Sequence, residues 1–195
     1  MSREEFPGEE VEIPEWDDEY LDRVADRLKF NYDLEKSERV RGESFPLYGQ
    51  LVVESRKQFL HPSVNYANQN VQEHLFARRV DAPAVADLER YVELGNELGD
   101  SWVEADEEHR STDFTFVLVG ETLPEDVAAF VEGFSDRTLL KYGYYGHYEV
   151  NLAVVAPDEQ RYVASENADA WRAFVDWEIE EEPGLLGRLL GKLRG

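Results

Sequence analysis

The stretches DFTFVLVGETLPEDVAAFVEGF (113–134) and TLLKYGYYGHYEVNLAVV (138–155) decide the fold of this chain. Asp113–Val119 is apolar at nearly every position, as expected of a strand that is covered on both faces. The capping box Thr122-Leu-Pro-Glu125 then predicts the start of a helix, because its side chains can satisfy amide N–H groups that a helix leaves unpaired. The inward face of this helix is predicted to hold Val127, Phe130, Val131 and Phe134. A strand followed by a helix and further strands predicts a sheet with helices packed on it.

Two further extended segments, Thr138–Tyr145 and Tyr148–Val155, meet near Gly146. They can pair with each other as a hairpin, whose turn would include Gly143 and Gly146. Alternatively, the strand at Asp113–Val119 joins one of them through a parallel crossover. The sequence leaves both arrangements open.

Outside this region the hydrophobic pattern predicts three more helices and two more extended runs. Helices start at Asp17 and at Asp81, and a short one covers Ala168–Trp177. Phe45–Phe59 is extended, and Glu73–Val80 is extended or helical. The residues expected on the buried sides of the first two helices are Tyr20, Leu21, Val24, Ala25 and Leu28, and Val85, Leu88, Val92, Leu98 and Trp102.

These elements predict an α+β fold, or alternatively an α/β fold, with a mixed β-sheet covered by helices. We expect a mobile acidic arm at residues 1–14 and a single domain at residues 15–177. Residues 178–195 are expected to form an acidic hinge followed by an amphipathic basic helix.

The charge of the chain indicates its environment. Asp and Glu number 43 against 20 Lys and Arg, a net charge of -23, while 42 % of the residues are hydrophobic. This composition is expected of a globular protein in a salt-loving cytoplasm, where concentrated salt screens repulsion between carboxylates. We therefore predict a cytoplasmic protein that requires high salt. Nucleic acid is not an expected partner, because phosphate contacts need a basic surface.

Two segments lack the acidic excess. Residues 37–80 carry six Lys or Arg and four Asp or Glu, and residues 137–150 carry two and one. One interpretation is a shared face that meets an anionic or aromatic ligand or a protein. The other is that these segments are half-buried strands, which are naturally poor in carboxylates. The candidate ligand-binding residues are Arg56, Lys57, His61, Asn65, Tyr66, Arg78, Arg79, Lys141, Tyr142, Tyr145, His147 and Glu149.

Motifs for catalysis and cofactor binding are absent from the sequence. It contains no G-x-G-x-x-G, no G-K-[ST] and no G-x-S-x-G, and no cysteine that could form a disulfide or bind zinc. One metal candidate, Glu107-Glu108-His109 with Asp113, lies in the most acidic third of the chain, where such clusters arise by chance. We therefore predict no catalytic residue, no cofactor and no metal site.

Asp113 and Glu149 invite comparison with magnesium-dependent nucleases, since strands that bear them flank a helix. That family requires a lysine two residues after the glutamate, and here Val150-Asn151-Leu152 follows Glu149. A buried Glu149 that pairs with an arginine or with Lys141 is the alternative. Glu149 and Asn151 are expected on one side of their strand, with Tyr148, Val150 and Leu152 on the other.

The C-terminal residues Leu185–Gly195 form a basic amphipathic segment. Its leucines fall on one side of a helical wheel, with Arg188, Lys192 and Arg194 beside them. We expect docking on its own domain, on a second copy of the chain or on an unknown protein partner. The alternative is weak binding to an anionic lipid surface.

Three stretches point to a family: IPEWDDEYLDRV (13–24) with NYDL (31–34), EHLFARR (73–79), and KYGYYGHYEVNLAVVAP (141–157). Together they resemble a family of uncharacterised proteins from halophilic archaea, over about residues 13–177. The resemblance implies a salt-loving source and no particular activity.

Function is left with three hypotheses. The first is a non-enzymatic binding or regulatory module that uses the segments 37–80 and 137–150. The second is a hydrolase acting on a phosphate-containing or nucleic-acid substrate, with His61, Lys141, His147 and Glu149 as the reacting groups. The third is a peripheral membrane or partner adaptor that uses the C-terminal helix.

Overall fold

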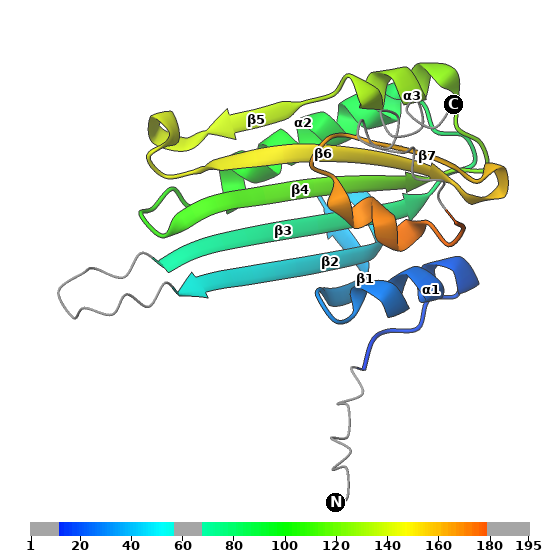
Figure 1. Ribbon diagram of the computed structural model, residues 1–195, viewed down its shortest axis with the longest axis horizontal. Helices are drawn as coiled ribbons and strands as arrows, with labels where there is room; N and C mark the ends of the chain where they lie inside the picture. Colours follow the sequence, from blue (N-terminus) through cyan, green and yellow to red (C-terminus); the bar gives the residue numbers. More distant parts are fainter. Residues whose placement is uncertain (1–11, 57–67, 179–195) are drawn as a thin grey trace, which may run out of the picture.

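The computed structural model describes residues 12–56 and 68–178, and these form one α+β domain built on a mixed sheet (Figure 1). The fold class expected from the sequence is confirmed. In chain order the elements are α1 (Glu19–Leu28), β1 (Asp33–Val40), β2 (Glu43–Arg56), β3 (Asn68–Arg79), α2 (Val85–Trp102), β4 (His109–Val119), α3 (Glu125–Glu132), β5 (Asp136–Leu139), the 3-10 turn η1 (Leu140–Gly143), β6 (His147–Ala156), η2 (Pro157–Glu159), β7 (Arg161–Ala164) and η3 (Asp169–Phe174).

The seven strands run in the order β1-β2-β3-β4-β6-β5, and β7 also pairs with β6. β3, β4 and β6 are mutually parallel, and the remaining pairs are antiparallel. β6 pairs with β5 through Val150 and its preceding residues, and with β7 from Ala153 onward. Both arrangements that the sequence left open therefore occur, since β6 joins β5 in a hairpin and β4 through a parallel crossover.

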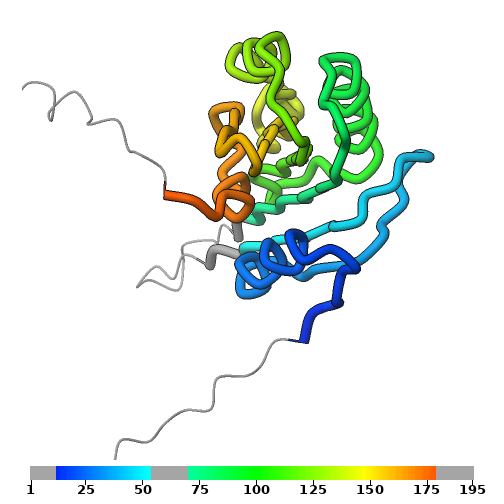
Figure 2. The backbone as a smooth tube through the Cα atoms, turned by 90° about the vertical axis from the view of Figure 1, so that its right-hand side faces the viewer, coloured from blue at the N-terminus to red at the C-terminus, as the bar shows by residue number. Residues whose placement is uncertain are grey.

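Two hydrophobic layers lie on opposite faces of the sheet. α2 and α3 pack on one face, and α1 and η3 on the other (Figures 1 and 2). β4 serves both layers, because successive side chains of a strand point to opposite faces. Phe114, Phe116 and Leu118 join the α2 layer, while Val117 and Val119 join the α1 layer.

The helix α1 forms as its sequence predicts. The Asp18 carboxylate accepts hydrogen bonds from the amide N–H groups of Tyr20 and Leu21 and so caps the first turn. All five apolar residues expected on its inner face are buried. Tyr20 also donates its hydroxyl hydrogen to the carbonyl oxygen of Phe174, at 2.5 Å, which ties α1 to η3.

The start of α3 differs from the expected capping box. The helix begins at Glu125 after Pro124, and no side chain caps it. The amide N–H of Leu123 instead bonds the Glu159 carboxylate at 2.9 Å. The prediction was wrong because the N-cap position is Pro124, two residues after Thr122, and proline has no side-chain oxygen to cap the helix.

Other departures from the sequence-based expectations concern short or edge elements. The strands β1 and β7 were not predicted, since β1 is mostly polar and β7 has only four residues. The extended run expected from Thr138 ends at Leu139, where η1 begins, and η3 is a 3-10 turn rather than an α-helix. Trp102, expected on the buried side of α2, is 42 % exposed because it is the last residue of the helix.

Candidate functional site

The α1 face of the sheet is only half covered by helices. α1 and η3 pack over the half nearer the carboxyl ends of β3, β4 and β6, and none of the helices in the described ranges packs over the other half (Figure 1). Next to the part that α1 and η3 cover, one row of residues crosses five neighbouring strands in register. The row consists of Leu51, Glu73, Asp113, Glu149 and Arg137.

The two glutamates of this row are held by different partners. Glu73 accepts hydrogen bonds from the Tyr32 hydroxyl at 2.6 Å and from the Thr115 hydroxyl at 2.8 Å. Glu149 is only 5 % exposed. Its Oε2 accepts from Nε and Nη2 of Arg137, at 3.1 and 2.9 Å, and its Oε1 accepts from the Asn167 amide at 2.6 Å. The expectation that a buried Glu149 pairs with an arginine is therefore confirmed, and its partner is Arg137 rather than Lys141.

Asp113, His147 and Glu149 form a compact group. Each offers one potential ligand atom, and these three atoms lie within 4.8 Å of one another. His147 Nε2 is 3.8 Å from Glu149 Oε2. We call these three residues the DHE cluster. The cluster combines residues from two parallel strands, because Asp113 is the register partner of Glu149 and His147 lies two residues earlier in β6.

The electrostatics of the cluster reflect burial and crowded carboxylates. Burial, and then the charges of Glu73 and Glu149, raise the pKa of Asp113 to about 7, against an opposing effect of Arg137. Burial and the charge of Arg137 lower the pKa of His147, although Glu149 acts in the opposite direction. At neutral pH the imidazole of His147 is therefore uncharged and has a lone pair available for a metal ion or a hydrogen-bond donor.

A cavity of about 440 Å³ adjoins the same row of residues. It opens between the end of α1, η3 and the sheet, and Glu73 lines it as well as standing next to Asp113 in the row. The cavity mixes cations, carboxylates and an aromatic ring; its lining includes Arg27, Asn31, Tyr32, Glu73, Asp169 and Arg172. This volume lies in the range of small-molecule sites.

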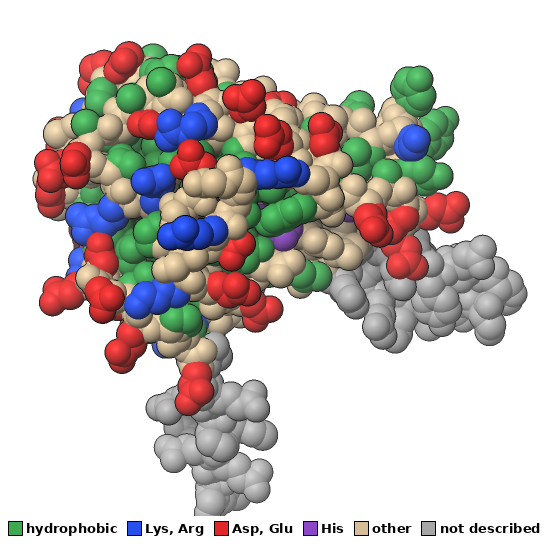
Figure 3. Space-filling view, turned by 180° about the vertical axis from the view of Figure 1, so that it is seen from behind, with side chains coloured by type: hydrophobic (Ala, Val, Ile, Leu, Met, Phe, Trp, Pro, Cys, Tyr) green, Lys and Arg blue, Asp and Glu red, His purple; other side chains and the backbone are tan. Residues whose placement is uncertain are grey.

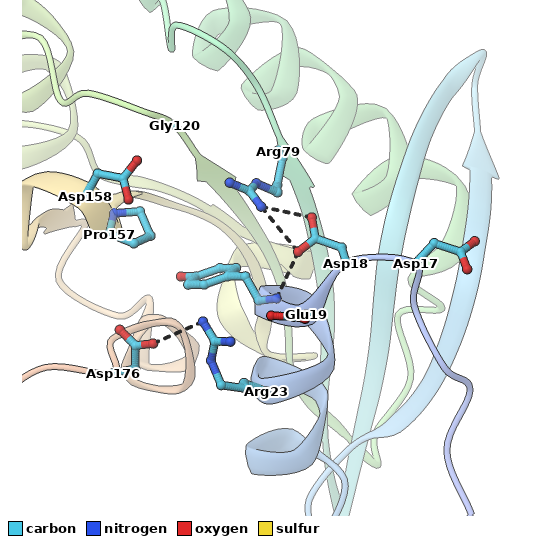
Figure 4. Close-up of a pocket in the computed structure, with 10 residues that line it drawn as sticks. Asp17, Asp18, Glu19, Arg23, Arg79, Gly120, Pro157, Asp158 and Asp176 are labelled. Atoms are coloured by element: carbon cyan, nitrogen blue, oxygen red, sulfur yellow. Dashed lines mark hydrogen bonds and ion pairs between the residues drawn. The ribbon is translucent and has the colours of Figure 1, made fainter.

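A second cavity, of about 610 Å³, lies at the carboxyl ends of β3, β4 and β6 beside the start of α1 (Figure 4). Its two cations are already paired. Arg79 bonds both oxygens of Asp18, at 3.2 and 3.0 Å, and Arg23 lies 3.5 Å from Asp176. Burial acts to raise the pKa of Asp18, but Arg79 and two amide N–H groups hold it below its usual value. Arg79 thus pairs with Asp18, the residue that caps α1, and has a structural role.

The candidate residues proposed from the sequence are dispersed. Arg78 points to the α2 face, where it bonds Glu43 and the Tyr91 hydroxyl, both at 3.2 Å, whereas Arg79 points to the α1 face. β4 lies between β3 and β6, so the segments 37–80 and 137–150 do not adjoin. Within residues 12–56 and 68–178 the two segments are thus separated by one strand, and the shared face expected from them stays a prediction.

The remaining candidates lie around η1 or outside the described residues. Lys141 and Tyr142 are exposed in η1, Tyr145 is half-buried, and only His147 and Glu149 belong to the DHE cluster. Arg56 ends β2. Lys57, His61, Asn65, Tyr66 and the C-terminal residues 185–195 lie outside the described residues, so the expectations about them stay predictions.

Among the described residues, the cluster Glu107-Glu108-His109, which was set aside as a metal site from the sequence, does not join Asp113 in a group of possible metal ligands. The Nδ1–H of His109 donates to the Tyr145 carbonyl oxygen at 2.7 Å, and its Nε2 lies 2.9 Å from the Thr112 hydroxyl oxygen. Asp113 instead faces the two residues from β6. Arg137, Asn167 and Glu73 were missed as members of the site. The sequence did contain one indication of this site, because Asp113 and Glu149 are isolated acids in largely apolar strands.

Comparison with known proteins identifies the family. Residues 17–176 match the model of a domain of unknown function, DUF8052, and the chain belongs to that family. The resemblance to an uncharacterised family is thereby confirmed, while a source in halophilic archaea stays a prediction. No curated protein matches the chain, and no solved structure does. Within the described residues, no helix combines the length and the apolar character that crossing a bilayer requires.

Proposed function

We propose that this member of the DUF8052 family is a binding module that takes a divalent cation at the DHE cluster. The observation that carries the proposal is the 4.8 Å grouping of one imidazole and two carboxylates. Ligand atoms about 2.0–2.2 Å from a metal stand about 3–4 Å apart, so a small contraction of the cluster would complete a site. The mixed nitrogen and oxygen ligands suit Mn²⁺, Fe²⁺ or Zn²⁺ better than Ca²⁺.

The surroundings of the cluster support this proposal. Three carboxylates share one row of the sheet, and their mutual repulsion contributes to the raised pKa of Asp113. A divalent cation would relieve that repulsion. The neutral imidazole of His147 is the form that binds metal. The adjoining 440 Å³ cavity then provides room for a small ligand next to the cation.

Arg137 competes with the proposed cation for Glu149. Both contacting nitrogens of the guanidinium meet Oε2, and the arginine side chain is 50 % exposed against 6 % for that of the glutamate. The arginine can therefore leave toward solvent while Glu149 stays in place. Cation binding would exchange one positive partner of Glu149 for another.

The test is a titration of the full-length protein with Mn²⁺ in concentrated KCl, followed by the electron paramagnetic resonance signal of free Mn²⁺. Concentrated KCl suppresses loose binding of Mn²⁺ to the acidic surface. We expect one tight site per chain that is lost in His147→Gln. The control Asp158→Asn removes an exposed acid away from the cluster and should keep the site. Equal binding by wild type and His147→Gln would refute the proposal.

A second candidate is a hydrolase acting on a phosphate-containing substrate. The observation that favours it is the pKa of Asp113 near 7, where a carboxyl group can serve as both acid and base. Of the groups named from the sequence, His147 and Glu149 lie in the cluster and Lys141 is exposed elsewhere. Hydrolysis of p-nitrophenyl phosphate by the Mn²⁺-loaded protein, abolished by Asp113→Asn, would favour this alternative. If p-nitrophenyl phosphate is not hydrolysed, the binding module stays the proposed function.

We also infer that the protein works in a cytoplasm with concentrated salt. The net charge of -23 on a chain of 195 residues supports this, because such a surface repels itself in dilute salt.

A further inference from the structure

A third cavity, of about 260 Å³, lies on the opposite face of the sheet from the DHE cluster. It opens between the end of α2 and the first residues of β3 and β4. Its lining includes Trp102, the amides of Asn70 and Gln72, and the carboxylates of Glu104, Asp106 and Glu108. The volume is below the usual range for drug-sized ligands, so the cavity suits a smaller molecule.

The indole of Trp102 is fixed in place at this cavity. Its ring packs against His74 and Phe114, with centroid distances of 5.2 and 6.3 Å, and yet 42 % of the residue is exposed. A rigid and partly exposed indole presents a flat face that attracts cations, because the electrons of the ring make that face negative.

Polar groups around the indole have unused hydrogen-bonding capacity. Within the described residues, neither the Trp102 N–H nor the Gln72 amide makes a hydrogen bond. The side-chain oxygen of Asn70 is buried with no hydrogen-bond partner. A buried hydrogen-bond acceptor without a donor is energetically unfavourable. If the Asn70 amide turns toward the cavity, a ligand N–H group can donate to its oxygen, and binding of such a ligand is therefore favoured.

The charge around the cavity has one sign. Three carboxylates border it, and among the residues that the structure describes no Lys or Arg lines it. In Figure 3, which views the molecule from behind relative to Figure 1, most of the Lys and Arg side chains lie in the left half, among Asp and Glu side chains. An anionic ligand is therefore disfavoured here, and a cation is favoured.

From these observations we propose that the Trp102 cavity binds a small organic cation that carries ammonium groups. The ring face of Trp102 contacts the cation, the carboxylates of Glu104 and Glu108 pair with it, and the amides of Gln72 and Asn70 accept its N–H groups. This site is independent of the DHE cluster, since the two lie on opposite faces of the sheet.

The experiment is isothermal titration calorimetry of the full-length protein in concentrated KCl, with 1,4-diaminobutane as the probe. 1,4-Butanediol has the same length and carries hydroxyls in place of ammonium groups, so it separates charge from shape. We expect saturable binding of one diamine per chain and no binding of the diol. In this salt the Debye length is only about 3 Å, so any binding that persists comes from direct contacts.

Two variants locate the binding. The double substitution Glu104→Gln and Glu108→Gln should weaken diamine binding about tenfold or more, and Trp102→Leu should do the same. Both glutamates are exposed, so the double variant keeps the fold even if Trp102→Leu destabilises it. The matched control Glu121→Gln with Glu132→Gln removes two exposed acids elsewhere and should change the affinity by less than about twofold. Binding of the diol, no binding of the diamine, or an equal loss in the control would overturn the proposal.

Discussion

Arg137 and Glu149 are register partners in the antiparallel pairing of β5 with β6, and two nitrogens of the arginine converge on one oxygen of the glutamate. The arginine is half-exposed and the glutamate is buried. The pair therefore neutralises a carboxylate inside the sheet with a cation that can leave. Such an arrangement permits exchange of the arginine for another cation.

The substitution Arg137→Gln should destabilise the cation-free protein and strengthen Mn²⁺ binding. Without the arginine, the buried charge of Glu149 loses its main partner, which we expect to lower the melting temperature by about 5 °C. Added Mn²⁺ should restore the melting temperature more in this variant than in wild type. The control Arg161→Gln breaks a surface pair with Glu125 and should have little effect on either measurement. Weaker Mn²⁺ binding by Arg137→Gln would contradict the competition.

The substitution Asp113→Asn should stabilise the cation-free protein above neutral pH. The folded-state pKa of Asp113, about 7, is higher than its ordinary value of 3.8. The stability that the protonated form contributes is fully present below about pH 4 and is lost as the pH rises through about 7. Asparagine stays uncharged, so melting temperatures measured at pH 8 should favour the variant, and those measured at pH 5 should differ less. If Asp113→Asn is instead less stable than wild type at pH 8, the fold stabilises the ionised carboxylate of Asp113, and the prediction is wrong.

His74 should make the fold sensitive to mild acid. Burial lowers its pKa to about 4 from an ordinary value of 6.5, and its Nδ1 lies 2.7 Å from the Tyr48 hydroxyl. The unfolded chain then binds a proton that the folded chain does not, so stability falls as the pH falls from about 6.5 to about 4. In His74→Phe this part of the pH dependence should disappear. Urea unfolding of both proteins across that interval measures the difference in slope, and equal slopes would rule out the proposed role of His74.

Low salt should unfold the protein. As KCl falls from about 1 M to about 0.01 M, the Debye length grows from about 3 Å to about 30 Å, and the carboxylates repel one another over the whole surface. We expect the melting temperature, followed by circular dichroism, to fall steadily across this titration. An unchanged melting temperature would contradict adaptation to concentrated salt.

Much of the fold follows from local sequence patterns. The strand at Asp113–Val119 and the helix with Tyr20 and Val24 on its inner side were both predicted, because each depends on periodicity within a few residues. The same periodicity correctly placed Glu149 on the side of β6 opposite to Tyr148 and Val150. Elements with a weak local pattern, such as β1 and β7, were missed.

Close contacts between elements could not be predicted. Gly99 lies inside α2, where glycine is unfavourable on helix propensity alone. In the fold, a Cβ atom at this position would lie 2.5 Å from the ring of Tyr148, so the glycine permits α2 to approach β6. The sequence pattern of α2 contains no information about the strand that packs under it.

The sequence by itself determined the acidic composition, the main helices and strands, and the face of β6 on which Glu149 lies, because composition and periodicity are local properties. Only the tertiary structure decided that Glu73, Asp113 and Glu149 share one row, that His147 joins Asp113, and that Arg137 rather than Lys141 neutralises Glu149. These neighbours come from strands that are distant in the chain. Their meeting depends on strand order and register, which long-range packing of the two hydrophobic layers establishes.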